Sequence, residues 1–321
     1  MKETEIGNDL ELAKKILKSG KLVAIPTETV YGLAANALDQ KAVSRIFEAK
    51  NRPTFDPLII HVGAIEEFNT YVKNVSKELM DIAFHFCPGP LTFLLEKQTN
   101  IPDLVTSGLS KVAIRIPNHP LSLSLLKSID FPLAAPSANP FGYISPTNAA
   151  HVYDQLNKKV DYILDGGQCE VGLESTIIGF EKNKLVVYRK GGLAIESIKE
   201  VFNGEIVIKT HSSSHPEAPG MLKKHYAPNK KMSVFSSSKE ISGDISKIGF
   251  LGFNRFLAEV PLENQFILSQ DSSLKEAASR LFLGLRWLDS LEIDTVYIEM
   301  LPEIGLGMAI NDRLRRASAA D

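Results

Sequence analysis

The chain has 321 residues, which is too long for one typical compact core and predicts two domains. Its hydrophobic fraction of 44% and charged fraction of 23% are typical of globular proteins, and its net charge of −2 excludes polyanion binding through overall charge. The two cysteines, Cys87 and Cys169, form no CxxC motif, which argues against a disulfide framework or a structural zinc site. We expect a cytoplasmic protein without membrane contact, because the N-terminus is acidic and amphipathic and no apolar run approaches bilayer length.

Helices and short strands alternate from the start of the chain. Apolar residues at helical spacing predict a helix over residues 10–17, closed by Gly20, and the run 21–25 predicts the first strand. Asp39 is the predicted N-cap of a second helix, which ends just before Pro53 because proline disfavours helical geometry in the preceding residue. Further strands are predicted at residues 58–62, 112–116, 133–135, 175–178 and 185–188. This alternation predicts an α/β domain built on a twisted mixed sheet.

A change in composition follows. Residues 211–220 are rich in Ser, Pro and Gly without periodicity, as in linkers. Beyond them, residues 248–253 and 294–300 are predicted strands, and residues 274–291 carry a helical apolar stripe. We therefore expect a second, smaller α/β domain.

Four short polar motifs lie at the ends of predicted strands or helices. They are PTETVYGL (26–33), Lys50-Asn51-Arg52, Ser137-Ala138-Asn139 and Ser175-Thr176. None is a P-loop or a GxGxxG turn, so a phosphate-binding glycine motif is missing. Cations and hydroxyl groups that could replace it are present, which indicates an anion-binding cleft built from side chains.

Arginines within apolar segments can be explained in two ways. Arg52, Arg115 and Arg189 lie in otherwise apolar segments, where each guanidinium needs a carboxylate or phosphate partner. Intramolecular salt bridges would satisfy any one of them. For all three together with Lys50, near polar strand ends, an external polyanion is the better explanation. His61 has the same two readings, as a hydrogen-bonded structural residue or as a ligand-binding residue. The hydroxyl and amide groups likewise serve turns and caps as readily as ligands.

The motifs, in this order, resemble those of the YrdC/Sua5 family of L-threonylcarbamoyladenylate synthases. PTETVYGL, Lys50-Asn51-Arg52, Ser137-Ala138-Asn139 and ESTI (174–177) carry the resemblance, which extends over the whole chain. The connector APGMLKKHYAP (218–228) is similar to the linker of the long, two-domain form. The implied organisation is a YrdC-like catalytic domain over residues 1–207, a linker or lid over 208–230, and a smaller Rossmann-like C-terminal domain over 231–321.

The resemblance implies the condensation of L-threonine, bicarbonate and ATP to threonylcarbamoyl-AMP and pyrophosphate, which is a nucleotidyltransferase reaction. A separate transferase complex would then use the product to make t6A in tRNA. Mg²⁺ carried by the ATP phosphates is the implied cofactor, and no protein-bound metal is expected. The alternative function is an RNA-binding or ribosome-maturation module of YrdC type, and a weak RNA contact is compatible with either reading.

Site residues are implied by motif position. Threonine would be held by Thr29, His61, Arg115, Ala135 and Ser175. The nucleotide would be held by Arg52, Asp56, Lys111, Ser137, Asn139, Ser145, Arg189 and Tyr226, with Lys50 and Arg52 as catalytic cations. Two positions depart from the family pattern, because many members have Asn in place of Asp56, and Ser or Thr often replaces Lys111.

Overall fold

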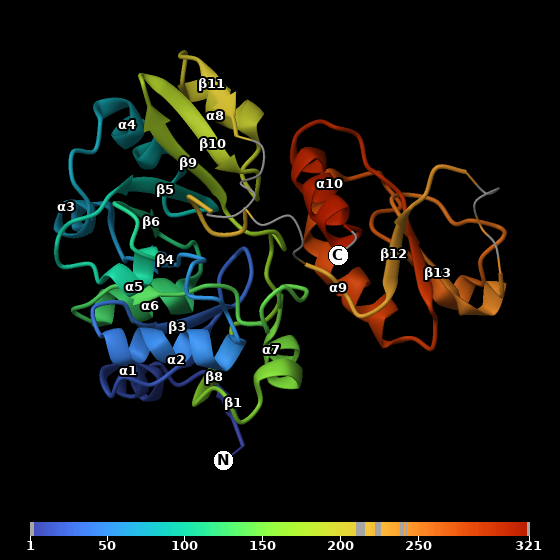
Figure 1. The fold of residues 1–321 in the computed structure, drawn as a ribbon, viewed down its shortest axis with the longest axis horizontal. Helices are drawn as coiled ribbons and strands as arrows, with labels where there is room; N and C mark the ends of the chain where they lie inside the picture. The colour runs from blue at the N-terminus through green and yellow to red at the C-terminus, as the bar shows by residue number, and fades with distance from the viewer. Residues whose placement is uncertain (1–2, 210–215, 222–225, 238–240, 242, 320–321) are drawn as a thin grey trace.

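The computed structural model describes residues 3–209, 216–221, 226–237, 241 and 243–319. Two bodies, each with its own sheet, lie side by side (Figure 1). Among the described residues, the last strand of the first sheet ends at Ile208 and the first strand of the second begins at Lys231. The predicted linker lies between them, and its residues 210–215 and 222–225 are outside the described ranges.

The N-terminal sheet is mixed, as predicted. Within the described residues its strand order is β1-β8-β2-β3-β7-β4-β6-β5-β9-β10-β11. The pairs β1/β8, β8/β2, β4/β6, β5/β9 and β10/β11 are parallel and the others are antiparallel. The strands are β1 (Glu5–Gly7), β2 (Val23–Ile25), β3 (Gly32–Asn36), β4 (Ile59–His61), β5 (Leu91–Glu96), β6 (Lys111–Arg115), β7 (Leu133–Ala134), β8 (Tyr162–Leu164), β9 (Thr176–Glu181), β10 (Lys184–Arg189) and β11 (Ile206–Ile208).

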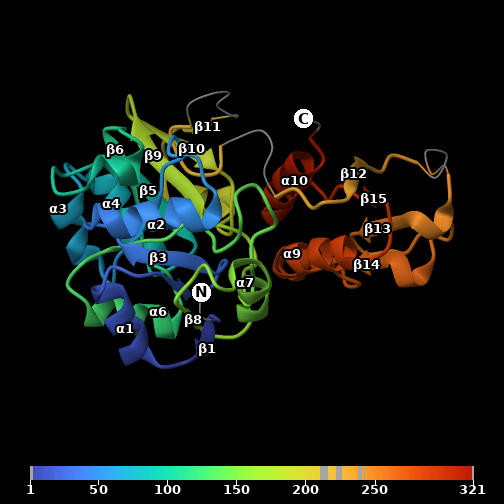
Figure 2. The same ribbon diagram turned by 60° about the horizontal axis from the view of Figure 1, so that its bottom comes forward.

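Helices cover the N-terminal sheet. They are α1 (Leu10–Lys18), α2 (Gln40–Lys50), α3 (Phe68–Tyr71), α4 (Lys77–Phe86), α5 (Asp103–Thr106), α6 (Pro120–Ser128), α7 (Ala149–Leu156) and α8 (Ile195–Val201). Figure 2 shows α2 and α1 on opposite sides of β3. The single-turn 3-10 helix η1 (Ile65–Glu67) leads into α3.

The two faces of this sheet are covered differently. On one face, α2, α4, α7 and α8 pack against apolar strand residues such as Leu33, Ile60 and Ile114. On the opposite face, α1 and α6 cover the part formed by β2, β3, β7 and β8. Farther along that face, residues of β4, β6, β9 and β10 meet Ala218 and Met221 from the segment between the two bodies. This second face is where polar strand side chains can reach a ligand.

Alternation along β4 and β6 explains which side chains reach that face. Ile60 and Ile114 point into the main core, whereas Ile59 and Ala113 belong to the cluster on the second face. Because successive strand residues point to opposite faces, His61 and Arg115 share the second face with Ile59 and Ala113. The two are register partners on neighbouring parallel strands.

The C-terminal body is a second α/β unit. Its sheet has the order β12-β15-β13-β14, and each neighbouring pair is parallel, which confirms the predicted smaller α/β domain. The strands are β12 (Lys231–Val234), β13 (Ile248–Gly252), β14 (Gln265–Ile267) and β15 (Thr295–Ile298). Helices α9 (Leu274–Ser290) and α10 (Leu306–Ala317) lie between this sheet and the N-terminal body (Figure 1), and the 3-10 turns η3 (Ile245–Lys247) and η4 (Leu262–Asn264) precede β13 and β14.

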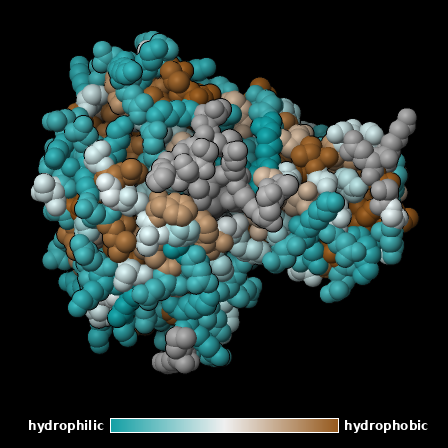
Figure 3. All heavy atoms as spheres, viewed as in Figure 1, coloured by the Kyte–Doolittle hydropathy of each residue, from teal (hydrophilic) through white to brown (hydrophobic). Residues whose placement is uncertain are grey.

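Hydrophilic side chains dominate the face in Figure 3, with apolar side chains in small separate areas. Within the described ranges, no helix combines the length and apolar character that crossing a bilayer requires.

Helix α2 ends through its own C-cap. The Asp39 side chain accepts a hydrogen bond from the Lys41 amide at 2.9 Å, which confirms the predicted N-cap. At the other end, Asn51 is left-handed, with φ of 51°, and the Arg52 amide donates to the Phe47 carbonyl at 2.9 Å. The helix ends where it was predicted to end, but Pro53 is not the main reason. The left-handed cap at Asn51 turns the chain before Pro53 is reached. This cap directs Arg52 out of the helix.

We expect Asn51→Val to destabilise the protein by about 1–2 kcal/mol, because a β-branched residue is strained at positive φ. Asn51→Gly should be neutral or slightly stabilising. Thermal unfolding followed by circular dichroism measures both, and Glu48→Val in the last turn of α2 is the matched control. Equal midpoints for the Val and Gly variants would contradict the cap assignment.

Candidate active site

A pocket of about 50 Å³ opens on the second face of the N-terminal sheet. It is enclosed by the loop before β3, the ends of β4, β6 and β10, the loop after β7, and the interdomain segment. The structure brings together here, from separate parts of the sequence, the predicted residues Thr29, Arg52, His61, Arg115, Ala135, Ser137, Ser175, Arg189 and Tyr226.

Four other predicted residues lie behind the pocket wall. The Lys50 ammonium donates to the carbonyls of Ser137, at 2.5 Å, and Asn139. Asn139 in turn donates from its amide to the carbonyls of Pro140 and Tyr143, both at 2.8 Å. These contacts hold the Ser137–Tyr143 loop against the end of α2. Ser145 and Asp56 are likewise buried, and each is bonded to a pocket residue: Ser145 to Glu174 and Asp56 to Arg52.

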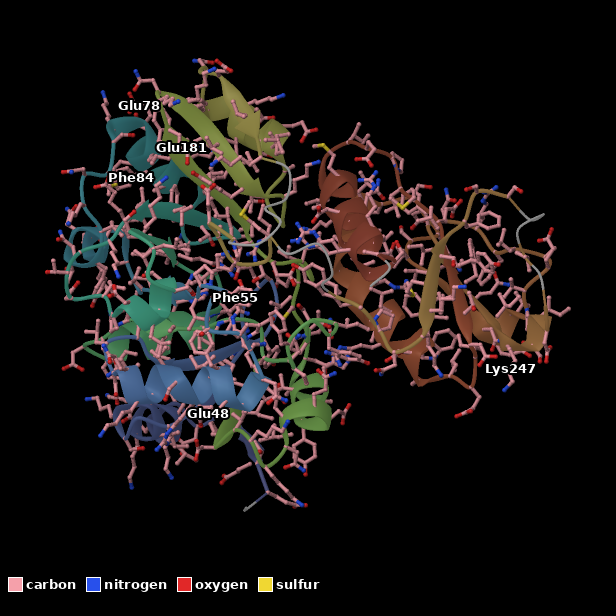
Figure 4. The ribbon with its side chains drawn as sticks, viewed as in Figure 1. Glu48, Phe55, Glu78, Phe84, Glu181 and Lys247 are labelled. Carbon is pink, nitrogen blue, oxygen red and sulfur yellow. The ribbon has the colours of Figure 1, made fainter. Side chains whose placement is uncertain are left out.

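Lys111 is not part of the pocket lining. Lys111 begins β6, and its ammonium lies 3.2 Å from Glu181 Oε1 at the end of β9. Tyr188 and Lys209 also contact Glu181. Figure 4 shows Glu181 in the upper part of the N-terminal body, away from Phe55 in the loop after Arg52. The hydrogen bond from Tyr188, together with the neighbouring lysines, lowers the pKa of Glu181 to about 2, so this carboxylate stays charged. Glu217, which lies 2.8 Å from the Lys209 ammonium, supplies a second carboxylate, so the two lysines are balanced within the cluster.

Arg115 is held by three groups. Its Nη2 lies 2.7 Å from Glu28 Oε1, its Nη1 donates to Thr29 Oγ1 at 2.8 Å, and its Nε donates to the Gly89 carbonyl at 3.3 Å. Thr29 is itself set by a tight turn, in which the amides of Thr29 and Val30 donate to Thr27 Oγ1. A guanidinium has five N–H groups, so further donors remain for an anionic ligand.

Arg52 is also paired within the chain. Its Nη2 lies 2.9 Å from Asp56 Oδ2 and donates to the Pro57 carbonyl at 2.8 Å. Intramolecular carboxylates thus accompany Arg52 and Arg115, as the salt-bridge reading predicts, and binding of an external anion to these two arginines stays a prediction. Sequence reasoning missed Glu28, although it lies inside the PTETVYGL motif between two threonines.

Arg189 differs from the other two arginines. It donates to the Ser175 carbonyl at 3.0 Å, to Ser175 Oγ at 3.1 Å and to the Pro219 carbonyl at 3.3 Å. Within the described part of the chain, no carboxylate lies at ion-pair distance from it. Burial lowers its pKa to about 10, so it remains a cation near neutral pH. A buried guanidinium with only neutral acceptors is the best-defined anion site of the pocket.

His61 lines the pocket as a neutral side chain. Burial, followed by the charge of Arg115, lowers its pKa to about 3. Its Nδ1 atom is buried and finds no hydrogen-bond acceptor or donor among the described residues. A neutral imidazole with an unsatisfied nitrogen suits hydrogen bonding to a polar ligand rather than charge pairing.

Tyr226 closes the pocket from the side of the second body. Its ring lies 5.6 Å from that of Phe282 in α9 and 5.3 Å below the guanidinium of Arg313 in α10. Glu174, which also lines the pocket, is 3.1 Å from the same guanidinium. The sequence contains no motif that points to Arg313, whereas Glu174 directly precedes the Ser175-Thr176 motif.

A metal site made of protein groups is not present in the described ranges. No three His, Cys, Asp or Glu side chains lie there in an arrangement that could hold a metal ion. The pocket cations Arg52, Arg115 and Arg189 instead suit an anionic ligand.

Two family models match adjacent parts of the chain. The one described as "Telomere recombination", Sua5/YciO/YrdC, matches residues 15–191, and "Threonylcarbamoyl-AMP synthase, C-terminal domain" matches residues 193–319. The chain belongs to the Sua5/YciO/YrdC family. Both models in one chain confirm the predicted long, two-domain Sua5 form.

Relatives within the family are similar along their whole length. The threonylcarbamoyl-AMP synthase of Pyrococcus abyssi is 39% identical over 96% of this chain and 94% of its own length. That of Bacillus subtilis is 36% identical over 97% and 94%. The crystal structure of P. abyssi Sua5 complexed with L-threonine matches with a TM-score of 0.88 and 38% identity, over 98% of this chain and 97% of that one. This agreement confirms the predicted fold.

Neutral His61 affects how the stability of the protein depends on pH. The unfolded chain, with a histidine pKa of about 6.5, binds more protons than the folded chain between pH 3 and 6.5. The free energy of unfolding should therefore rise with pH over this window. In ligand-free protein, we expect His61→Gln to reduce that slope, measured as the thermal midpoint from pH 4.5 to 7.5.

The control for this experiment is His85→Gln, at an exposed position of α4. Part of the slope should remain in the His61 variant, because burial and Arg286 lower the pKa of His151 to about 4. An unchanged slope in His61→Gln would show that this imidazole is not held neutral.

Proposed function

We propose that this protein is an L-threonylcarbamoyladenylate synthase, a nucleotidyltransferase that condenses L-threonine, bicarbonate and ATP to threonylcarbamoyl-AMP and pyrophosphate. The observation that carries the proposal is its match to the threonine-complexed Sua5 of P. abyssi over nearly the entire chain. The names of the P. abyssi and B. subtilis relatives support the same reaction.

Threonine would occupy the part of the pocket around Arg115. The free N–H groups of that guanidinium suit the substrate carboxylate, while Glu28 keeps the guanidinium in place. Neutral His61 and the hydroxyls of Thr29 and Ser175 offer hydrogen bonds to the remaining polar groups. Main-chain groups at Ala135 would orient the amino acid from the opposite wall.

ATP would occupy the part of the pocket around Arg52, Ser137 and Arg189. Arg189, which among the three pocket arginines has no carboxylate partner in the described chain, is the natural phosphate ligand. Lys50 and Asn139 would act from behind by holding the Ser137 loop, and Asp56 by holding Arg52. Burial, followed by the charge of Arg52, lowers the pKa of Lys50 well below its usual value, and a bound anion nearby would raise this pKa again.

The pocket is smaller than the substrates. A volume of about 50 Å³ holds only a few water molecules at about 10–15 Å³ each by this measure. We infer that the wall formed by Gly220 and Tyr226 moves outward to admit ATP and then closes over it. Such closure would keep water from the reactive intermediates.

The chemistry needs no enzyme nucleophile. The threonine amine adds to the carbon of bicarbonate-derived CO₂ and loses a proton, which gives a carbamate. A carbamate oxygen then attacks the α-phosphorus of ATP, the bond to the bridging oxygen breaks, and pyrophosphate leaves. Positioning and neutralisation of developing negative charge dominate such transfers, and Arg52, Arg189 and Lys50 are suited to both tasks.

Mg²⁺ would enter with the ATP phosphates and neutralise part of their charge. The donor set of the pocket, which is mainly cationic and hydroxylic, fits a metal carried by its ligand better than one held by carboxylates. A t6A transferase complex is the proposed consumer of the product. Direct RNA contact and the positions of the two domain boundaries stay predictions.

We expect pyrophosphate release from ATP and bicarbonate to require L-threonine. Valine and serine should support slower release, because valine lacks the hydroxyl that the polar groups of the pocket can bind and serine lacks the methyl group that would fill it. A coupled pyrophosphate assay with each amino acid and with none measures this. Release that ignores the amino acid would contradict the proposal, and RNA titrations would then test the alternative.

Arg189→Met should raise the Kd for ATP by about 10- to 100-fold, the cost of losing a charge-assisted contact. Isothermal titration of the full chain measures the affinity. Lys184→Met is the matched control, because Lys184 begins the same strand and forms an exposed ion pair with Glu205. Equal affinities for wild type and Arg189→Met would remove Arg189 from the nucleotide site.

A further inference from the structure

The second body places a fully buried arginine against the pocket wall. Arg313 of α10 is 0% exposed, and its Nε and Nη2 atoms both lie 3.1 Å from Glu174 Oε2. Its Nη1 donates to the Lys190 carbonyl at 2.7 Å and to Asp312 at 3.0 Å. The N-terminal and C-terminal bodies are thus joined by a buried ion pair, not only by apolar packing.

This ion pair is connected to the ligand-facing groups. Glu174 lines the pocket, and its other oxygen accepts a hydrogen bond from Ser145 Oγ at 2.6 Å. The Arg313 guanidinium also lies 5.3 Å from the ring centre of Tyr226, which lines the same pocket. One side chain of the C-terminal body therefore contacts two residues of the pocket wall.

Neighbouring arginines of the C-terminal body hold the same loops. Arg286 of α9 donates to the carbonyls of Ile144 and Ser145, the latter at 3.4 Å. Arg316 of α10 donates to the carbonyl of Gly220. These main-chain contacts dock the bodies, whereas Arg313 alone among the three compensates a carboxylate of the pocket.

Glu174 would be harmful to anion binding without such compensation. It lines the same small pocket as Arg189, which has no carboxylate at ion-pair distance within the described chain. A buried, unpaired carboxylate is strongly unfavourable and would turn to the nearest available cation. A Glu174–Arg189 pair would compete with an anionic ligand for Arg189.

We propose that Arg313 is a positioning residue for the nucleotide site, which acts by occupying Glu174 and so leaving Arg189 available to the phosphates of ATP. The inference deepens the proposed synthase function and rests on it. Arg313 does not touch the substrate in this arrangement. It makes the nucleotide affinity of the N-terminal body dependent on the C-terminal body.

The test is a double-mutant cycle on the full chain, with the Kd for ATP measured by isothermal titration. Arg313→Met should raise the Kd by about 10- to 100-fold, because it frees Glu174 to capture Arg189. Adding Glu174→Gln to that variant removes the competing charge and should recover most of the lost affinity. If Arg313 had only a structural role, the double variant would bind ATP with a Kd at least as high as that of Arg313→Met alone.

Arg315→Met is the matched control. Arg315 lies on the same helix in an exposed ion pair with Glu303, so its loss should change the Kd by less than about twofold. In the pyrophosphate assay, Arg313→Met should raise KM for ATP more than it lowers kcat. Circular dichroism checks folding. If Arg313→Met does not fold, Arg313→Gln, which removes the charge but keeps hydrogen-bond donors, replaces it in the same cycle.

Two outcomes would overturn the inference: an unchanged Kd in Arg313→Met, or equal loss in the single and double variants. Failure of the proposed synthase function can be told apart from failure of this inference, because ATP affinity is measured without turnover. A wild-type protein that binds ATP but releases no threonine-dependent pyrophosphate would refute the synthase and leave the cycle interpretable.

Discussion

Arg52, Arg115 and Arg189 are buried on one face of the N-terminal sheet, and each guanidinium must be compensated there for the water it has lost. Asp56 and Glu28 compensate the first two, and neutral acceptors surround the third. Two of the pocket arginines are therefore neutralised by carboxylates, and the third is not. Paired arginines hold their geometry before a ligand arrives, while Arg189 keeps the capacity to bind an anion.

The second body completes the same charge balance. Glu174 places a carboxylate in the pocket wall near the uncompensated arginine, and Arg313 from α10 neutralises it. Tyr226 lies between the bodies, stacked on Phe282 and beneath Arg313. The same ion pair therefore joins the two bodies and sets the charge of the pocket wall. This is how a small C-terminal domain can influence a site that is lined mainly by the larger domain.

Much of the site could be predicted because its residues occur in short local motifs. The PTETVYGL turn, the end of α2 and the Ser137-Ala138-Asn139 loop each carry several polar groups within a few consecutive residues, so each can be recognised from local sequence. Periodicity also revealed the strands around His61 and Arg115. It missed β5 (Leu91–Glu96), which is buried on both faces and shows no alternation except at its last residue. Pairings such as Arg115 with Glu28, 87 residues apart in the chain, carry no local signal.

The sequence by itself determined the α/β class, the two-body organisation, the family and the polar groups available to the site, because these depend on local pattern and motif order. Only the tertiary structure decided which cations are already paired, that Lys111 lies with Glu181 outside the pocket, and that Arg313 reaches Glu174. The physical reason is that the charge state and availability of a buried group depend on its neighbours in space. Those neighbours come from strands and helices that are far apart in the chain.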